Sequence, residues 1–122
     1  MADALKNAGS EKIKSFEKFW PFYLNEHQHP VNRQLHFIGS ALALLSLGTA
    51  IVTRKKRFLA LAPVLGYIFA WIGHFMIERN RPATFTYPAK SLLGDFKMFG
   101  LSLQGKLNAE LERQQNLQDH TD

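Results

Sequence analysis

The sequence predicts an all-α integral membrane protein, a hairpin of two transmembrane helices flanked by amphipathic helices. Residues 34–53 and 58–77 contain no Asp, Glu, Lys or Arg and are rich in Leu, Ala, Ile and Phe. Each window has the length with which a helix crosses about 30 Å of hydrocarbon. The alternative is a soluble bundle with two buried helices, but a chain of 122 residues cannot easily surround two helices that are apolar on all sides.

The composition narrows the possible function classes. Aromatic residues make up 12% of the chain and the net charge is only +5, which argues against a disordered chain. The absence of Cys excludes a disulfide scaffold, a zinc ribbon, a thiol nucleophile and an iron–sulfur cluster. Because the basic residues concentrate at the predicted membrane boundaries, the positive charge does not predict nucleic-acid binding. We find no pattern of a cleavable signal peptide and expect the chain to be retained whole.

An amphipathic helix is predicted over residues 10–24. Ser10 is a plausible N-cap, and Pro21 is a position at which the helix is expected to kink or end. The apolar side chains recur at helical spacing: Ile13, Phe16, Phe19, Trp20 and Tyr23.

The two apolar helices follow a polar turn over residues 25–31. We predict the first over residues 32–53 and the second over residues 58–79. The basic residues 54–57 leave room only for a tight hairpin loop, and the two prolines within residues 80–88 predict an extended loop.

The C-terminal part is predicted to form one more amphipathic helix over residues 89–113, because Leu and Phe recur at helical spacing. We expect residues 114–122 to be a mobile tail. With no repeat and no linker, residues 1–122 form a single predicted domain.

Two histidines are expected at the same depth of the hairpin. Arg54 follows His36 by 18 positions, which corresponds to about 27 Å of helix. His74 follows Arg57 by 17 positions, which corresponds to about 26 Å at the same rise. If the two helices are antiparallel neighbours, both histidines lie at the membrane face opposite the basic loop.

Three more polar residues belong to that face. His27 and His29 come from the turn just before the first apolar helix, and Glu78 follows His74 by four residues on the same side of its helix. Isolated histidines at a helix end are commonly interfacial polar residues, but ionisable groups that converge in a membrane protein tend to be functional. Imidazole and carboxylate without thiolate suit Fe(II), Zn or Mn. His29 lies in the turn itself, which can direct its side chain outward, and His120 is assigned no role.

The same face is bordered by arginines and one acid. Arg33 and Arg81 are candidates to hold a carboxylate or phosphate, since a guanidinium binds such groups through two hydrogen bonds. Arg79 is more simply interpreted as a headgroup anchor. Asp95 either accepts a hydrogen bond from a metal-binding histidine or pairs with an arginine of the loop 80–88.

Two motifs that straddle the hairpin resemble a known membrane family. They are His27-x-x-Pro30-x-Asn32-x-x-x-His36-x-x-Gly39 and Gly73-His74-x-x-x-Glu78-x-x-Arg81-Pro82. The family was formerly a domain of unknown function, and its characterised fungal member is an endoplasmic-reticulum 2-hydroxy fatty acid dioxygenase of alpha-oxidation. The resemblance covers roughly residues 16–105. The chain is similar to the short bacterial branch in three stretches: Phe19 to Leu24, Ala70 to His74 and Ser91 to Phe96.

The resemblance implies an Fe(II)-dependent enzyme that uses molecular oxygen to remove one carbon from a 2-hydroxy fatty acid. It implies that His27, His36 and His74 are the metal ligands, whereas His29 matches less well. Glu78 matches a family acid that is either a ligand or a supporting residue. We treat Asn32, which lies within the first motif, as a possible supporting residue together with His29 and Asp95. The products are the shortened acid and carbon dioxide, without 2-oxoglutarate or an external reductant.

We therefore predict a membrane dioxygenase whose partners are a 2-hydroxy fatty acid, oxygen and membrane lipid, with no nucleic acid. Two alternatives remain open: a non-catalytic lipid-binding or assembly protein, and a zinc-dependent lipid hydrolase with Glu78 as general base. More basic residues flank the histidine face than the loop 54–57. We therefore expect a bacterial inner-membrane protein with termini and site in the cytoplasm.

Overall fold

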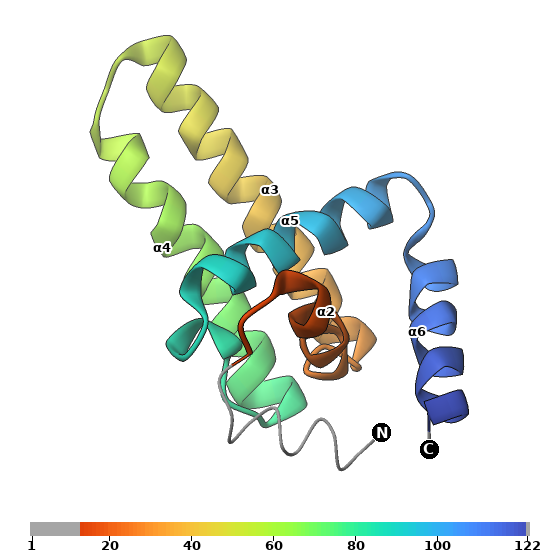
Figure 1. The fold of residues 1–122 in the computed structure, drawn as a ribbon. Helices are drawn as coiled ribbons and strands as arrows, with labels where there is room; N and C mark the ends of the chain where they lie inside the picture. Colours follow the sequence, from red (N-terminus) through yellow and green to blue (C-terminus); the bar gives the residue numbers. More distant parts are fainter. Residues whose placement is uncertain (1–12, 122) are drawn as a thin grey trace.

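The computed structural model describes residues 13–121, and every regular element within them is helical. The predicted all-α class is therefore confirmed for this part of the chain (Figure 1). The elements are α2 (Phe16–Asn25), α3 (Pro30–Thr53), α4 (Arg57–Ile72) with its π-helical continuation η1 (Gly73–Glu78), a 3-10 turn η2 (Ala83–Phe85), α5 (Pro88–Leu103) and α6 (Leu107–Thr121).

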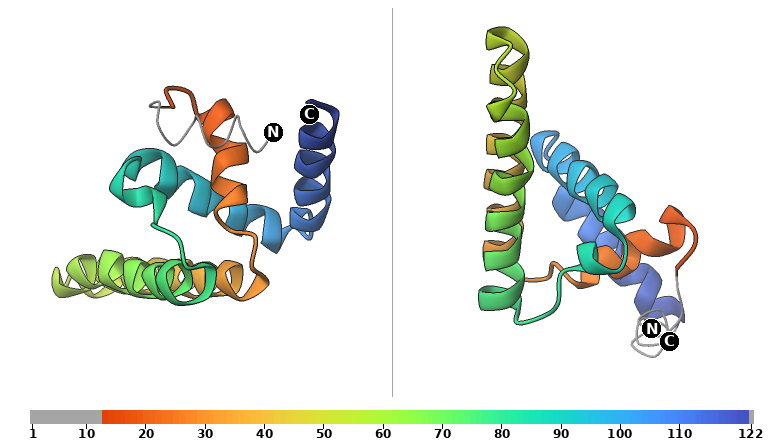
Figure 2. Two further views of the ribbon diagram at one scale, coloured as in Figure 1. Left: turned by 90° about the horizontal axis from the view of Figure 1, so that it is seen from below. Right: turned by 90° about the vertical axis from the view of Figure 1, so that its left-hand side faces the viewer.

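Helices α3 and α4 form the predicted antiparallel hairpin, which projects well beyond the other helices (Figures 1 and 2). The helix Pro30–Thr53 and the continuous helix Arg57–Glu78 are both long and apolar enough to span a membrane. Only 22% of each apolar window is buried inside the protein. This low burial is unlike that of core helices in a soluble bundle, which cover their apolar side chains on all sides.

Small residues allow the two long helices to pack closely. A Cβ atom on Gly39 would lie 3.0 Å from the Cβ of Phe69 and 3.1 Å from the carbonyl oxygen of Gly66. Further along the contact, the hydroxyl of Ser46 donates a hydrogen bond of 2.8 Å to the carbonyl of Phe58. Close approach over small side chains is a common way to pack apolar helices that lack a hydrophobic driving force between them.

Helices α2, α5 and α6 lie on one side of the hairpin (Figure 2). Their shared core contains the buried aromatic residues Phe19, Trp20 and Tyr23 of α2 and the fully buried Met98 of α5. Gly94 of α5 lies against the ring of Tyr23, where an added Cβ would come within 2.8 Å. This contact brings α5 close to α2 at the end of the hairpin that carries the histidines.

The start of two helices differs from the prediction. Helix α2 begins at Phe16, and its N-cap is Ser15, whose side chain accepts a hydrogen bond from the amide of Lys18. The predicted N-cap Ser10 lies outside the described residues. Helix α3 begins at Pro30 instead of Asn32, since proline at the first helical position loses no hydrogen bond there.

The predicted amphipathic helix over residues 89–113 is wrong, because the chain forms two helices there. Helix α5 ends at Leu103, and Gly105 adopts a left-handed conformation with φ of +70°. Glycine tolerates this conformation without steric cost, and it ends the helix. Residues 114–121, expected in a mobile tail, belong to α6. There the buried side chain of Gln114 donates a hydrogen bond of 2.9 Å to Glu110.

Candidate metal centre

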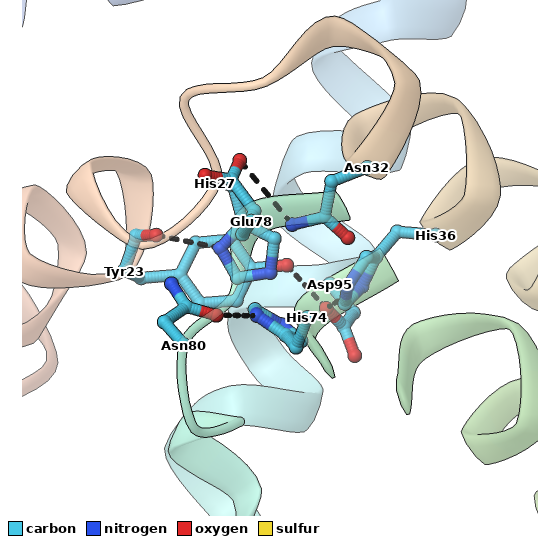
Figure 3. Close-up of polar contacts among 8 residues, drawn as sticks. All are labelled: Tyr23, His27, Asn32, His36, His74, Glu78, Asn80 and Asp95. Carbon is cyan, nitrogen blue, oxygen red and sulfur yellow. Dashed lines mark hydrogen bonds and ion pairs between the residues drawn. The ribbon is translucent and has the colours of Figure 1, made fainter. Parts of the chain in front are cut away.

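Three histidines from separate parts of the chain meet at one buried point (Figure 3). His27 follows α2, His36 lies two turns into α3, and His74 lies in η1. The ring centroids are 4.4, 4.5 and 4.9 Å apart. One ring nitrogen from each residue lies within 4.8 Å of the other two. The group can therefore hold one metal ion between three imidazoles.

Local structure explains how these rings converge. Only two residues separate His27 from Pro30, the first residue of α3, so the turn returns the chain directly to the hairpin. His74 lies in a π-helical segment, which the sequence pattern did not predict. Such segments are rare and occur frequently at functional sites. The segment ends where the amide of Asn80 donates a hydrogen bond of 2.9 Å to the carbonyl of His74.

Each ring has its Nδ1 atom bonded to an oxygen outside the group. The Nδ1 of His27 lies 2.6 Å from the carbonyl oxygen of Tyr23, and that of His36 lies 3.1 Å from Oδ1 of Asp95. The Nδ1 of His74 lies 2.8 Å from Oδ1 of Asn80. Carbonyl and carboxylate oxygens only accept, so Nδ1 carries the hydrogen in these rings and Nε2 keeps its lone pair.

The orientation of the Asn80 amide follows from its other contacts. Its Nδ2 donates to the backbone oxygen of Glu26 at 3.0 Å and to Oε2 of the same residue at 2.5 Å. Since the nitrogen is directed at two acceptors, the oxygen faces His74. This arrangement assigns the hydrogen of the His74 ring to Nδ1 as well.

The Nε2 atoms of His27 and His36 are buried and have no hydrogen-bond partner among residues 13–121. Burying a polar nitrogen without a partner costs about 1–3 kcal/mol, and native proteins rarely leave such atoms unpaired. A metal ion bound by the three Nε2 atoms would supply the missing partner. Three protein ligands also leave coordination positions open, as catalytic sites require.

The electrostatic surroundings of His27 favour the neutral form of its ring, which is the form that binds a metal. Burial, followed by the neighbouring rings of His36 and His74, lowers the pKa of His27 well below its ordinary value. The ring is therefore neutral at neutral pH, and metal ligation by histidine needs the neutral form. Burial and the charge of Asp95 raise the pKa of Tyr23, so its hydroxyl keeps its proton and donates it in a hydrogen bond to Asp95.

Glu78 lies outside the three-histidine group. Its Oε1 accepts a hydrogen bond from the backbone amide of His29 and a longer one, 3.5 Å, from the side chain of Asn32. Asn32 is fully buried, and its Oδ1 would lie only 1.9 Å from a Cβ on Gly73. Glu78, Asn32 and Gly73 thus connect the start of α3 to the segment that carries His74.

The other candidate residues are distributed around this centre. Asp95 reaches His36, as described above, and His29 is exposed and caps α3 through its Nδ1. Arg33 donates hydrogen bonds to the backbone oxygens of His27 and Gln28 at 2.9 and 2.7 Å, so its guanidinium holds the turn. Arg81 is exposed and lies over the ring of Phe85 at 5.2 Å.

Sequence reasoning missed Tyr23 and Asn80. Tyr23 provides a backbone oxygen for His27 and a hydroxyl for Asp95, but its spacing identified it only as part of an apolar face. Asn80 was one polar residue of a loop. Its position within the motif that runs from Gly73 to Pro82, directly before Arg81, is the only sequence signal that could have indicated its role.

No curated protein and no solved structure shows a significant match to the chain. A family model described as 2-hydroxy-palmitic acid dioxygenase Mpo1-like matches residues 13–107. The matched range contains the three histidines together with Tyr23 and Asp95. This match confirms the resemblance that the two motifs indicated, and the chain belongs to the Mpo1-like family.

Proposed function

We propose that this protein is an Fe(II)-dependent membrane dioxygenase that shortens 2-hydroxy fatty acids by one carbon. The observation that carries the proposal is the group of three buried imidazoles. In each ring Nδ1 is hydrogen-bonded to an oxygen outside the group, which leaves Nε2 as the atom that can bind a metal. The name of the family supports the reaction type and the substrate class. The products are the acid one carbon shorter, carbon dioxide and water.

The hairpin supports a location in the membrane, since α3 and the helix Arg57–Glu78 have the length and composition of spans. His36 lies near the start of α3 and His74 near the end of the helix Arg57–Glu78, so both lie at the end of the hairpin opposite the basic loop 54–57. We propose that this end lies at the bilayer surface, where the polar head of a fatty acid resides while its chain stays in the apolar phase. We propose an inner-membrane protein with its termini and centre in the cytoplasm, and the excess of basic residues at this end supports this orientation.

His27, His36 and His74 would hold the iron, which when bound supplies a site for oxygen activation. Asp95, Asn80 and the carbonyl of Tyr23 fix the rings so that Nε2 faces the metal position. The three imidazole ligands are neutral, so no protein anion among them balances the charge of a divalent cation. This donor set favours an anionic substrate such as a 2-hydroxy acid.

The substrate itself supplies the electrons that reduce oxygen. Oxidation of a 2-hydroxy acid to carbon dioxide and the shortened acid releases four electrons, which is the number that one molecule of oxygen takes up. The reaction therefore needs neither 2-oxoglutarate nor an external reductant.

The zinc hydrolase alternative receives less support. It requires Glu78 as a general base, but its carboxylate accepts hydrogen bonds from the amide of His29 and from Asn32. We propose instead that Glu78 supports the centre by joining the start of α3 to η1.

Product analysis tests the proposal. Detergent-purified protein loaded with Fe(II) is incubated with 2-hydroxypalmitic acid under oxygen, and we expect the fifteen-carbon acid to appear. Palmitic acid, which lacks the hydroxyl group, is the control substrate, and His36→Ala is the control protein. A shortened acid that forms equally with His36→Ala, or no shortened acid with the iron-loaded wild type, contradicts the proposal.

A further inference from the structure

An open groove of about 480 Å³ lies on the outer side of the metal centre. It is lined by Phe75 and Met76 of η1 and by Arg79, Asn80 and Arg81 of the following loop. Asn80 belongs to both sites, because its Oδ1 accepts the hydrogen bond from His74. A molecule in the groove would therefore be separated from a metal ligand by one side chain.

Two cationic side chains, Arg79 and Arg81, line the groove. Within residues 13–121, neither Arg79 nor Arg81 forms an ion pair or a hydrogen bond through its guanidinium. The nearby acids are engaged elsewhere, Glu78 with the start of α3 and Glu26 with the amide of Asn80. Two exposed guanidinium groups beside one groove favour an anionic occupant, and carboxylate fits their paired donors.

The backbone at Arg79 is held in an uncommon conformation. Its φ of +58° lies in the left-handed region, which non-glycine residues seldom adopt. The next residue is fixed by bonds from its backbone to His74 and from its side chain to Glu26, so the chain has little freedom to relax. The same contacts that orient His74 therefore also direct Arg79 to the groove.

The other wall of the groove is apolar and continues along the exposed side of α4. Phe75 is 52% exposed and Met76 is 70% exposed. The ring of Phe85 lies 6.3 Å from that of Phe75 and 5.5 Å from that of Trp71, which extends the apolar surface toward the hairpin. Tryptophan is enriched at the boundary between water and lipid, so Trp71 is typical of that position. The groove thus combines a cationic end with an apolar end.

We propose that this groove binds the carboxylate of a long-chain fatty acid between Arg79 and Arg81, with the acyl chain along Phe75 and Met76. The choice of a fatty acid over an anionic phospholipid rests on the proposed function and on Asn80, which connects the groove to the metal centre. The groove is the site at which the acid is taken from the bilayer surface before it reaches the histidines.

Equilibrium binding to the metal-free protein tests this site. The protein is placed in phosphatidylcholine nanodiscs and titrated with palmitic acid labelled with ¹³C at its carboxyl carbon, observed by NMR. The groove variant carries Arg79→Gln and Arg81→Gln. The matched control carries Lys55→Gln and Lys56→Gln in the loop at the far end of the hairpin and loses the same charge. Circular dichroism shows whether both variants retain the helical fold, and Arg79→Lys with Arg81→Lys retains the charge.

We expect the groove variant to bind palmitic acid about tenfold more weakly or worse, since hydrogen bonds to charged groups are among the strongest in proteins. We expect the control variant to bind palmitic acid like the wild type and the lysine variant to bind it with intermediate affinity. The uncharged methyl ester of palmitic acid should bind to all of these proteins with the same affinity. Equal affinity of the groove and control variants for palmitic acid overturns the proposal. Displacement of palmitic acid by equimolar phosphatidylglycerol also overturns it, because the groove is then a phospholipid site.

Different results would contradict the proposed function and the proposed groove site. Palmitic acid lacks the 2-hydroxyl group and the assay uses no metal, so binding does not depend on catalysis. Normal binding without turnover of 2-hydroxypalmitic acid contradicts the proposed function alone. If the wild type turns over 2-hydroxypalmitic acid but binds palmitic acid no more tightly than the groove variant does, only the proposed groove site is contradicted.

Discussion

The carboxylate of Asp95 in α5 lies 3.1 Å from Nδ1 of His36 in α3, and the same Oδ1 atom accepts the hydroxyl of Tyr23 in α2. One oxygen therefore connects three helices beside the three-histidine group (Figure 3). A carboxylate behind a histidine fixes the ring orientation and increases the basicity of the ligand nitrogen.

Replacing Asp95 should weaken metal binding more than it weakens the fold. We expect Asp95→Ala to lower the affinity for Fe(II) by about 10- to 100-fold, the usual effect of removing a group that supports a ligand. Anaerobic metal titration measures the effect. Asp119→Ala, which removes a carboxylate from an exposed part of α6, is the control and should bind as the wild type does. Unchanged affinity in Asp95→Ala would show that the carboxylate does not support the centre.

The depth of His36 and His74 could be predicted from the sequence, because residue counts from the charged loop fix it once the helices are antiparallel. The contact of Asp95 with a histidine was one of two alternatives that the sequence left open, and the contact of Asp95 with Tyr23 could not be predicted. Asp95 and Tyr23 meet only because α5 packs across α2 at Gly94, a tertiary contact that leaves no periodic signal. The break at Gly105 had a glycine as its signal, but the spacing of Leu and Phe continued through it.

Tyr23 and Asp95 should influence the metal affinity jointly and not independently. Tyr23→Phe removes only the hydroxyl that donates to Asp95 and leaves the backbone oxygen for His27. We expect a smaller loss of metal affinity than for Asp95→Ala, and the double variant should be no weaker than Asp95→Ala alone, because contacting residues are not additive. Metal titration of the four proteins measures this, with Tyr67→Phe as a control on α4. Fully additive losses would argue against the shared contact.

Gly73 should be essential for the junction between α3 and η1. A Cβ at this position would lie 1.9 Å from Oδ1 of the buried Asn32, so we expect Gly73→Ala to destabilise the protein by about 1–3 kcal/mol or more. Denaturant unfolding in detergent measures the change. Gly100→Ala is the matched control, since a Cβ there meets nothing within 4 Å and alanine favours the helix. Equal stability of the two variants would contradict the packing described here.

The contact between α2 and α6 should depend on pH. Burial raises the pKa of Glu110, but hydrogen bonds from Gln114, Arg113 and Trp20 outweigh it and lower the pKa overall. A carboxyl whose pKa is lower in the folded state stabilises the fold above its unfolded pKa of about 4.3. That stability is lost as the pH falls through the folded value.

We therefore expect the wild type to lose more stability between pH 7 and pH 3 than Glu110→Gln does. Thermal unfolding at a series of pH values provides the measurement, and Glu112→Gln on the exposed side of α6 is the control. A pH dependence that is the same in the wild type and Glu110→Gln would rule out this contribution.

Metal analysis of purified protein reconstituted anaerobically with Fe(II) tests the central claim most directly. We predict one tightly bound iron per chain in the wild type and its loss in His27→Ala, His36→Ala and His74→Ala. His29→Ala and His120→Ala, which alter histidines outside the buried group, should retain the iron. Wild-type protein without bound iron, or iron content unchanged by the three core substitutions, would contradict the assignment of this centre.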